Sequence, residues 1–423
     1  MAKFIVKKSA PLRGEVTISG SKNAVLPIMA ATLITEEECI IKDAPALRDV
    51  DVMCDLIANL GADVEKDLDN NTVKVKAAGE LNYEAPCDLV KMMRASILVL
   101  GALLIRNGRA VIHLPGGCAI GERPVELHLK GLKALGAHID ESQLAKGIVD
   151  ARAEKLTGNT IYLDFPSVGA TEVIVMAATH AEGTTIIENA AQEPEIVDLA
   201  NFLNKMGAKI KGAGTDTIKI EGVQKLRGVT HGVIPDRIEA GTFMVSAAIT
   251  GGRILIKNML PDHLKAVIAK LRECGVVIEM TDEGVIVDGS INELVSTDVK
   301  TLPYPGFPTD MQSPFMALLT VAKGPSVIIE TVFENRFMHV GEFNRMGAAI
   351  RTEGKCAIIP GERRLQGAQV VATDLRAGAA VVLTGLVAEG ETEVAQIFHI
   401  DRGYEHFVDK LKALGANIER VED

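Results

Sequence analysis

The sequence lacks the cysteine patterns and short motifs that mark several common kinds of site. No CxxC pair and no regular cysteine spacing occurs, which argues against a zinc site and a disulfide framework and predicts reduced thiols. The six cysteines are Cys39, Cys54, Cys87, Cys118, Cys274 and Cys356. There is also no GxxxxGK[ST] loop, no GxGxxG after a first strand, no HExxH and no Ser-His-Asp phrase. Any anion site must therefore be assembled from residues scattered along the chain.

Positive charge and long apolar runs are scarce as well. The net charge of -11 argues against nucleic acid as a partner, because phosphate backbones are bound mainly by clustered Lys and Arg. The apolar run SILVLGALLI (96–105) has about half of the ~20 residues that span a bilayer. The N-terminal MAKFIVKKSAPLRGEV has no apolar core of the kind found in signal peptides. We therefore predict a cytoplasmic protein without a membrane span.

A short phrase recurs six times through the 423 residues. Its copies are LIANLGADV, LKALGAHID, FLNKMGAKI, KLRECGVVI, FNRMGAAI and LKALGANI, and their shared glycines are Gly61, Gly136, Gly207, Gly275, Gly347 and Gly415. The period is about 70 residues, too long for most solenoid repeats. Each copy predicts the end of an amphipathic helix, a glycine in the left-handed conformation and the start of a strand.

A second phrase, an Ala-rich helix that runs through a turn into an apolar strand, also recurs six times, as in MAATHAEGTTIIENAA (176–191). Each unit therefore contains two helices and several strands, which suits a βαβαββ module in an α/β protein. Three modules would bury one core and six would make two domains, consistent with the chain length. We place one boundary near HGVIPDRIEAG (231–241) and expect a second crossing near Gly20.

Unusual polar residues collect at two equivalent places in the repeats. At the start of the Ala-rich helix lie Lys22, Arg94, Ser167 to Thr171, Arg237, Asp310, Asp374 and Arg376; in the loop after the next strand lie Cys118, Arg123, Arg336 and Arg402. A lone Arg or Lys is most often a solvated surface charge, and Asp310 or Asp374 before a helix is most often an N-cap. A cation in a first turn is unfavourable for the helix, so its recurrence points to an anion bound there.

Cys118 differs from the other cysteines because it follows two glycines in LPGGCAIGERPVELH and precedes Arg123 by five residues. A thiol in such a loop, near fixed positive charge, is expected to be exposed and to have a lowered pKa. That property suits either a nucleophile or a proton donor at neutral pH. Cys39, Cys54, Cys274 and Cys356 lie in apolar runs or repeat elements, as expected of inert packing residues, whereas Cys87, between Pro86 and Asp88, is ambiguous.

Several phrases together resemble one family. SGSKNAVLPIMAA, LPGGCAIGERPVELHLKGLKALGA, SVGATE, VIPDRIEAGTF, PGFPTDMQ, ENRFMHV and TDLRAGAA are similar to the UDP-N-acetylglucosamine 1-carboxyvinyltransferases, from Lys22 to Arg402. The resemblance implies a transferase that moves the enolpyruvyl group of phosphoenolpyruvate to the 3-hydroxyl of UDP-N-acetylglucosamine and releases phosphate. That reaction is the first committed step of peptidoglycan synthesis, in cell wall biogenesis, and the family is the target of fosfomycin.

The resemblance also implies a fold and a set of partners. It implies two inside-out α/β barrel domains, each of three βαβαββ repeats: residues 22–233, which carry the Cys118 loop, and residues 1–21 with 234–423. The active site would lie in the cleft between them. Phosphoenolpyruvate and UDP-N-acetylglucosamine would be the small-molecule substrates, with no metal, no organic cofactor, no nucleic acid and no membrane. The oligomeric state stays open.

Roles for individual residues follow from the same resemblance. Cys118 would donate a proton to the methylene carbon of phosphoenolpyruvate, and Asp310 would act as the base toward the sugar hydroxyl; Lys22 and Arg402 complete the catalytic set. Contacts to phosphoenolpyruvate would come from Lys22, Asn23, Arg94, Arg123, Arg376 and Arg402. Contacts to the nucleotide sugar would come from Arg94, Arg123, Pro124, Val125, Glu126, Leu127, Ser167, Val168, Gly169, Asp310 and Val332, with Arg336 and Asp374 in support. Phe165 stands where some relatives have lysine, which puts contacts from that position in doubt.

Two other functions are weighed against this one. A 3-phosphoshikimate enolpyruvyl transferase shares the architecture and phosphoenolpyruvate but lacks the PGGCAIGERPVEL phrase. A catalytically idle paralogue, whether it binds sugar nucleotides or acts as a scaffold, predicts substitutions at Lys22, Cys118, Asp310 or Arg402, and this sequence has none of them.

Overall fold

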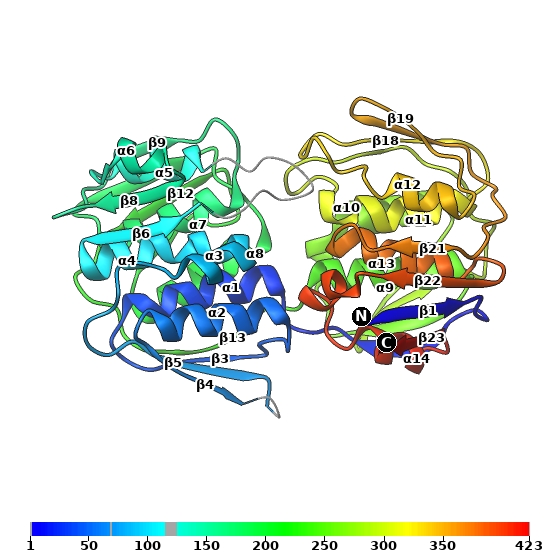
Figure 1. Ribbon diagram of the computed structural model, residues 1–423, viewed down its shortest axis with the longest axis horizontal. Coiled ribbons are helices and arrows are strands. Elements are labelled where there is room, and N and C mark those ends of the chain that lie inside the picture. Colours follow the sequence, from blue (N-terminus) through cyan, green and yellow to red (C-terminus); the bar gives the residue numbers. More distant parts are fainter. Residues whose placement is uncertain (1, 68–69, 115–124, 423) are drawn as a thin grey trace. The chain divides into compact units, whose positions relative to one another are not determined.

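The chain forms two compact units, each with its own hydrophobic core (Figure 1). The computed structural model describes residues 2–67, 70–114 and 125–422. Of these, residues 20–114 and 125–234 form one unit, here called the N-terminal unit. Residues 2–19 and 235–422 form the other, the C-terminal unit. The chain therefore passes from one unit to the other near residue 20 and again near residue 235.

The six repeat glycines adopt the left-handed backbone that the sequence predicts, with φ between +90° and +112°. They follow the helices α2 (Arg48–Asn59), α5 (Glu126–Ala134), α8 (Pro194–Met206), α10 (Lys265–Glu273), α12 (Val340–Arg345) and α14 (Phe407–Ala413). After each glycine, the next N–H donates to a carbonyl five residues back, as Ala208 does to Leu203 at 3.0 Å. This is the Schellman motif, in which the glycine avoids the penalty that a Cβ atom would bring.

The described strands form six separate sheets, one for each repeat. The N-terminal unit contains the sheets β13-β3-β5-β4, β6-β8-β7 and β11-β12-β10-β9, and the C-terminal unit contains β15-β16-β14-β2, β17-β18-β20-β19 and β21-β22-β1-β23. In the third sheet β9 (Thr160–Tyr162) pairs parallel with β10 (Thr184–Glu188), whereas β12 (Thr217–Glu221) and β11 (Lys209–Lys211) continue antiparallel. This pairing is the βαβαββ module that the repeat length predicts.

Three strands complete sheets that lie far from them in sequence. In the C-terminal unit, β2 (Arg13–Thr17) pairs parallel with β14 (Arg253–Lys257), and β1 (Lys3–Lys7) lies between β22 (Glu391–Ala395) and β23 (Asn417–Val421). In the N-terminal unit, β13 (Thr230–Gly232) pairs parallel with β3 (Cys39–Lys42). These pairings give the first and last repeats of a unit the strands that their own segments lack.

The remaining elements have the following bounds. Strands are β4 (Asp63–Asp67), β5 (Thr72–Lys76), β6 (Arg109–His113), β7 (His138–Ile139), β8 (Ile148–Arg152), β15 (Val277–Thr281), β16 (Gly284–Asp288), β17 (Val299–Lys300), β18 (Ser326–Ile329), β19 (Arg351–Glu353), β20 (Cys356–Ile359) and β21 (Gln369–Val371). Short helices are α3 (Cys87–Met92) and α6 (Glu141–Leu144), and 3₁₀ helices are η1 (Thr32–Ile34), η2 (Arg94–Leu98), η3 (Pro261–Leu264), η4 (Thr309–Met311) and η5 (Ile397–Arg402).

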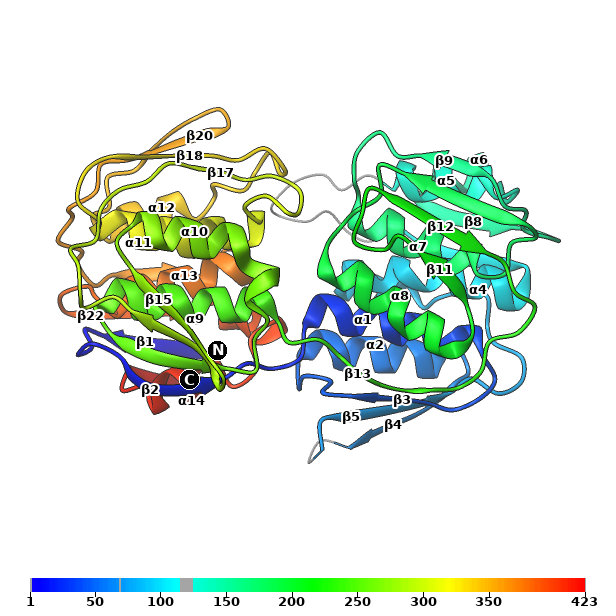
Figure 2. The same ribbon diagram turned by 180° about the vertical axis from the view of Figure 1, so that it is seen from behind.

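Six Ala-rich helices fill the interior of the two units, and the sheets lie outside them (Figure 1, and from behind in Figure 2). They are α1 (Lys22–Ala31), α4 (Val99–Asn107) and α7 (Val168–Ala178) in the N-terminal unit, and α9 (Arg237–Thr250), α11 (Gln312–Val321) and α13 (Leu375–Gly385) in the C-terminal unit. Nearly every position of each helix is buried, as expected of helices that are apolar all round. Small residues allow this close packing, since a Cβ atom on Gly101 would lie 2.7 Å from the Val173 carbonyl oxygen.

The arrangement is therefore α/β and inside-out, with helices at the centre of each unit. The sheets of a unit are separate among the described residues, so no single closed sheet forms a barrel. No helix in the described ranges is long and apolar enough to cross a membrane.

Candidate active site

The polar residues that the sequence places at the starts of the Ala-rich helices do lie there. Lys22, Val168 and Arg237 are the first residues of α1, α7 and α9, Arg94 begins η2 before α4, Asp310 lies in η4 before α11, and Arg376 is the second residue of α13. Ser21, Ser167, Asp236 and Asp374 are N-caps that accept backbone N–H groups. In each unit, the N-termini of the Ala-rich helices therefore carry both free backbone N–H donors and charged side chains.

Lys22 is held by a buried ion pair in the N-terminal unit. Its Nζ lies 2.7 Å from Oδ2 of Asp49, and the two residues are 9% and 2% exposed. Asp49 lies in the first turn of α2, where a carboxylate is favoured by the helix dipole. Asp49 thus keeps Lys22 charged and directed, at a position the sequence does not single out. The neighbouring Asn23 is half-buried in α1.

Arg94, His128 and Gly169 meet in the same unit. The imidazole of His128 on α5 is 5% exposed, and its Nε2 would lie 2.9 Å from a Cβ atom on Gly169. Burial and, to a smaller extent, the charge of Arg94 lower the pKa of His128 to about 4. The ring is therefore neutral at pH 7. His128 carries no sequence signal other than its place directly after the predicted residues 123–127.

We expect the His128 ring to stay neutral down to about pH 4, since protonating it would bury a charge beside Arg94. Because the unfolded chain binds a proton near pH 6.5, folding stability should fall as the pH drops from about 6.5 to about 4. Histidine-selective NMR at several pH values, with a His128→Gln variant to assign the signal, measures this directly. A His128 signal that titrates near its ordinary pKa would contradict the expectation.

Six of the residues predicted to contact the nucleotide sugar, 125–127 and 167–169, belong to the segments around this group. Val125 is buried and directly precedes α5, in which Glu126 is exposed and Leu127 half-buried. Ser167, Val168 and Gly169 form the half-buried start of α7, where the Ser167 Oγ accepts the Ala170 N–H at 3.4 Å. The ring of Phe165 is 43% exposed just before them. The starts of α5 and α7 thus come together, as helix N-termini suited to phosphate do.

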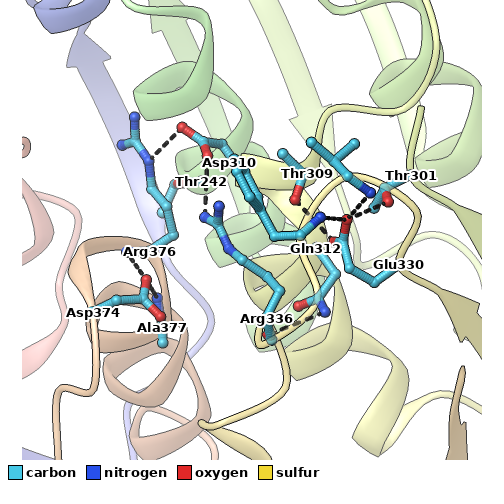
Figure 3. A network of polar contacts seen from close by, with 12 residues as sticks. Thr242, Thr301, Thr309, Asp310, Gln312, Glu330, Arg336, Asp374, Arg376 and Ala377 are labelled. Carbon is cyan, nitrogen blue, oxygen red and sulfur yellow. Dashed lines mark hydrogen bonds and ion pairs between the residues drawn. The ribbon is translucent and has the colours of Figure 1, made fainter. Parts of the chain in front are cut away.

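Asp310 lies between two arginines in the C-terminal unit (Figure 3). Its Oδ1 is 3.1 Å from Nη2 of Arg336, and its Oδ2 is 3.2 Å from Nε of Arg376. The arginines are 3% and 2% exposed, whereas the Asp310 side chain is 27% exposed. The carboxylate is thus oriented by two buried guanidinium groups while remaining accessible. The buried Nη1 of Arg336 has no hydrogen-bond partner among the described residues, so a donor is left for a ligand oxygen.

Arg376 keeps its charge in this buried position. Burial alone would lower the pKa of Arg376, but Tyr404 and Asp310 outweigh it and raise the pKa above its ordinary value. The guanidinium lies over the Tyr404 ring at 5.1 Å, a cation–π arrangement. The hydroxyl of Tyr404 is in turn 2.9 Å from Oγ1 of Thr242 on α9. Residues of η4, of α9 and of the segment after η5 therefore all support the charged Arg376 on α13.

Asp374 and Arg402 belong to the same cluster. Asp374 is the N-cap of α13 and accepts the N–H groups of Arg376 and Ala377 at 2.9 and 3.0 Å (Figure 3). Arg402, the last residue of η5, is half-buried. Burial and the charge of Arg402 lower the pKa of His399, and Asp374 opposes that change. The 3₁₀ helix η5, which ends at Arg402, packs against α13, which Asp374 caps, so the two charged residues lie on adjoining elements.

Three of the predicted site residues cannot be compared with the structure. Cys118, Arg123 and Pro124 lie outside the described residues.

Val332 is half-buried in the loop after β18, next to the segment that carries Arg336. Within the described ranges, no group of three or more His, Cys, Asp or Glu side chains could hold a metal ion.

Comparisons with known proteins agree on one family. A family model described as EPSP synthase (3-phosphoshikimate 1-carboxyvinyltransferase) matches residues 6–411. The chain is 62% identical over 418 residues to UDP-N-acetylglucosamine 1-carboxyvinyltransferase 1 of Caldanaerobacter subterraneus subsp. tengcongensis, covering 99% of both chains. It is 57% identical over 427 residues to UDP-N-acetylglucosamine 1-carboxyvinyltransferase 2 of Carboxydothermus hydrogenoformans, covering all of both.

Solved structures give the same fold. The enolpyruvyl transferase NikO from Streptomyces tendae superposes with a TM-score of 0.88 at 26% identity, covering 99% of both chains. EPSP synthase from Acinetobacter baumannii superposes with a TM-score of 0.78 at 19% identity over the full length of both, which is evidence for the fold alone. Since both its sequence and its fold match over nearly their whole length, the chain belongs to the EPSP synthase family of enolpyruvyl transferases and, within it, to the UDP-N-acetylglucosamine 1-carboxyvinyltransferases.

Proposed function

We propose that this protein transfers the enolpyruvyl group of phosphoenolpyruvate to the 3-hydroxyl of UDP-N-acetylglucosamine and releases phosphate. The reaction would be the first committed step of peptidoglycan synthesis and would take place in the cytoplasm. Beside the identity to named relatives, the observation that carries the proposal is Asp310, an accessible carboxylate oriented by the buried Arg336 and Arg376.

The proposed chemistry has two steps. In the first, Asp310 takes the proton of the sugar 3-hydroxyl while the oxygen of that hydroxyl bonds to the central carbon of phosphoenolpyruvate. In the same step, Cys118 gives a proton to the methylene carbon. In the second, the methyl carbon so formed returns a proton to the Cys118 thiolate while the bond to the phosphate oxygen breaks, and the proton held by Asp310 passes to the departing phosphate. The products are the enolpyruvyl ether and inorganic phosphate, so atoms and charge balance without a cofactor.

The cations would hold the anionic substrates. Phosphoenolpyruvate and the diphosphate bring several negative charges, which explains why an acidic chain buries Lys22, Arg336 and Arg376. Arg94, Arg123 and Arg402 are proposed to add to this set, with Asn23 beside Lys22. The segments 125–127 and 167–169 are proposed to take the uridine and diphosphate, because helix N-termini present free N–H groups to phosphate.

Phosphate release tests the proposal directly. Purified protein is mixed with phosphoenolpyruvate alone, with UDP-N-acetylglucosamine added, or with 3-phosphoshikimate added. We expect phosphate to appear only with UDP-N-acetylglucosamine. Release with 3-phosphoshikimate instead would favour the acceptor named in the family description. No release with either acceptor, from folded protein, would favour the idle paralogue.

A further inference from the structure

A buried carboxylate, Glu330, joins two segments of the candidate site. It directly follows β18 and is 1% exposed. Its Oε1 accepts hydrogen bonds from Oγ1 of Thr301 at 2.8 Å and from the N–H groups of Val332 and Phe333 at 2.8 and 3.2 Å. Its Oε2 accepts from Oγ1 of Thr309 at 2.9 Å (Figure 3). These four hydrogen bonds tie the segment that contains Thr309 and the loop that contains Val332 to one carboxylate.

The same position in other repeats is occupied by a different kind of residue. Asp43, Asn189, Asn258 and Gln396 directly follow β3, β10, β14 and β22, and all four have a left-handed backbone with φ between +52° and +58°. Short polar residues tolerate that conformation, and it begins the turn after the strand. Glu330 is not left-handed. The fifth repeat therefore replaces a turn residue with a buried charged one.

Glu330 keeps one contact that the turn residue makes in other repeats, the one to the residue after the first strand of the module, and it adds further hydrogen bonds. Asn189 donates to the Leu163 carbonyl at 2.7 Å, and Asn258 to the Ile18 carbonyl at 2.8 Å, so each ties its loop to the residue after the first strand of its module. Thr301, which follows β17, makes the matching tie to Glu330. The bonds to Thr309 and to the loop N–H groups have no counterpart in those two asparagines. Where a repeat departs from its own pattern at a cost in buried charge, a functional reason is expected.

Both added contacts reach segments of the proposed acceptor site. Thr309 directly precedes Asp310, and Val332 is the residue expected beside the sugar. We propose that Glu330 is a positioning residue that holds Asp310 and the Val332 loop in register, so that the sugar hydroxyl meets its base. The inference rests on the proposed function. It predicts a larger defect toward UDP-N-acetylglucosamine than toward phosphoenolpyruvate, because Asp310 and Val332 are the proposed sugar contacts of these two segments.

Two variants separate positioning from charge. In Glu330→Gln, the amide oxygen still accepts from Thr301 and the two N–H groups, while the amide nitrogen donates to Thr309 Oγ1, which can act as an acceptor. Glu330→Ala removes all four bonds. We expect Glu330→Ala to lower kcat/KM for UDP-N-acetylglucosamine by about 10²-fold, the loss that a shift of about 1 Å can cause, with a smaller change in KM for phosphoenolpyruvate. Glu330→Gln should restore most of the activity.

The matched control is Asn258→Gly, which removes the corresponding tie in the preceding repeat. Glycine tolerates the left-handed backbone there, so its kinetic constants should equal those of the wild type. If Glu330→Ala fails to fold, Thr309→Val removes a single bond of Glu330 and should still lower kcat alone. Unchanged kinetics in Glu330→Ala or Thr309→Val, with a lowered melting temperature, would reduce Glu330 to a structural residue and overturn the inference.

Three outcomes separate the inference from the proposed function. A Glu330→Gln variant as slow as Glu330→Ala would mean that the negative charge itself is required, which contradicts positioning by hydrogen bonds. Wild-type protein without turnover would overturn the proposed function and this inference with it. An active wild type with an unaffected Glu330→Ala would overturn the inference alone.

Discussion

Replacing Cys118 with alanine should abolish measurable turnover while leaving the unfolding transition unchanged. In the proposed reaction this thiol gives the proton to the methylene carbon, a contribution that is typically about 10²- to 10⁴-fold for a general acid. Steady-state phosphate release and a urea titration measure the two quantities. A near-normal rate would remove Cys118 from the mechanism.

Cys356→Ala is the matched control for this prediction. Cys356 lies on β20 of the C-terminal unit, is half-buried and forms no disulfide, so its loss should leave turnover intact. Fosfomycin gives a second readout, since this epoxide should alkylate Cys118 in the wild type and in Cys356→Ala but not in Cys118→Ala. An unchanged intact-protein mass after incubation of the wild type with drug and UDP-N-acetylglucosamine would count against the assignment.

Asp310→Asn should lower kcat by about 10³-fold, within the range expected for loss of a general base. Asparagine has nearly the same shape, and its single amide oxygen can still accept from one of the two arginines, so KM for UDP-N-acetylglucosamine should change little. It cannot take up the hydroxyl proton. Single-turnover measurement of enolpyruvyl ether formation tests the chemical step directly.

A structural role for Asp310 predicts a different result. The variant leaves two buried guanidinium groups without a carboxylate, which by itself lowers stability. Asp288→Asn makes the same charge change at a buried aspartate that pairs with Arg253 at 3.3 Å, elsewhere in the C-terminal unit. If Asp310→Asn and Asp288→Asn lose stability alike and both keep kcat, Asp310 is an anchor for the arginines and not the base.

The repeat architecture was predictable because its signals are local. A glycine after an amphipathic helix stops that helix wherever it occurs, and all six copies adopt the expected backbone. The starts of the interior helices were equally predictable, since Lys22, Arg94, Asp310 and Arg376 occupy equivalent places in copies of one phrase. The resemblance to the transferases then supplied roles that spacing alone could not.

Contacts between distant segments were not predictable. Nothing around Asp49 in the sequence indicates that it pairs with Lys22, because the pair forms only when α2 packs against α1. His128 reads as an ordinary residue of α5 until the start of α7 is placed against it. Glu330 likewise reads as a polar residue after an apolar strand, and only the tertiary structure shows four donors converging on it.

The number of modules, the ends and starts of their helices, the α/β class and the family could all be predicted from the amino-acid sequence. These depend on periodicity, on turn chemistry and on phrases that a chain carries before it folds. The tertiary structure alone decided that Asp310, Arg336 and Arg376 would share one ion-pair network, since each comes from a different segment. Burial of apolar helix faces brings such segments together, and the polar side chains at the helix ends meet as a consequence.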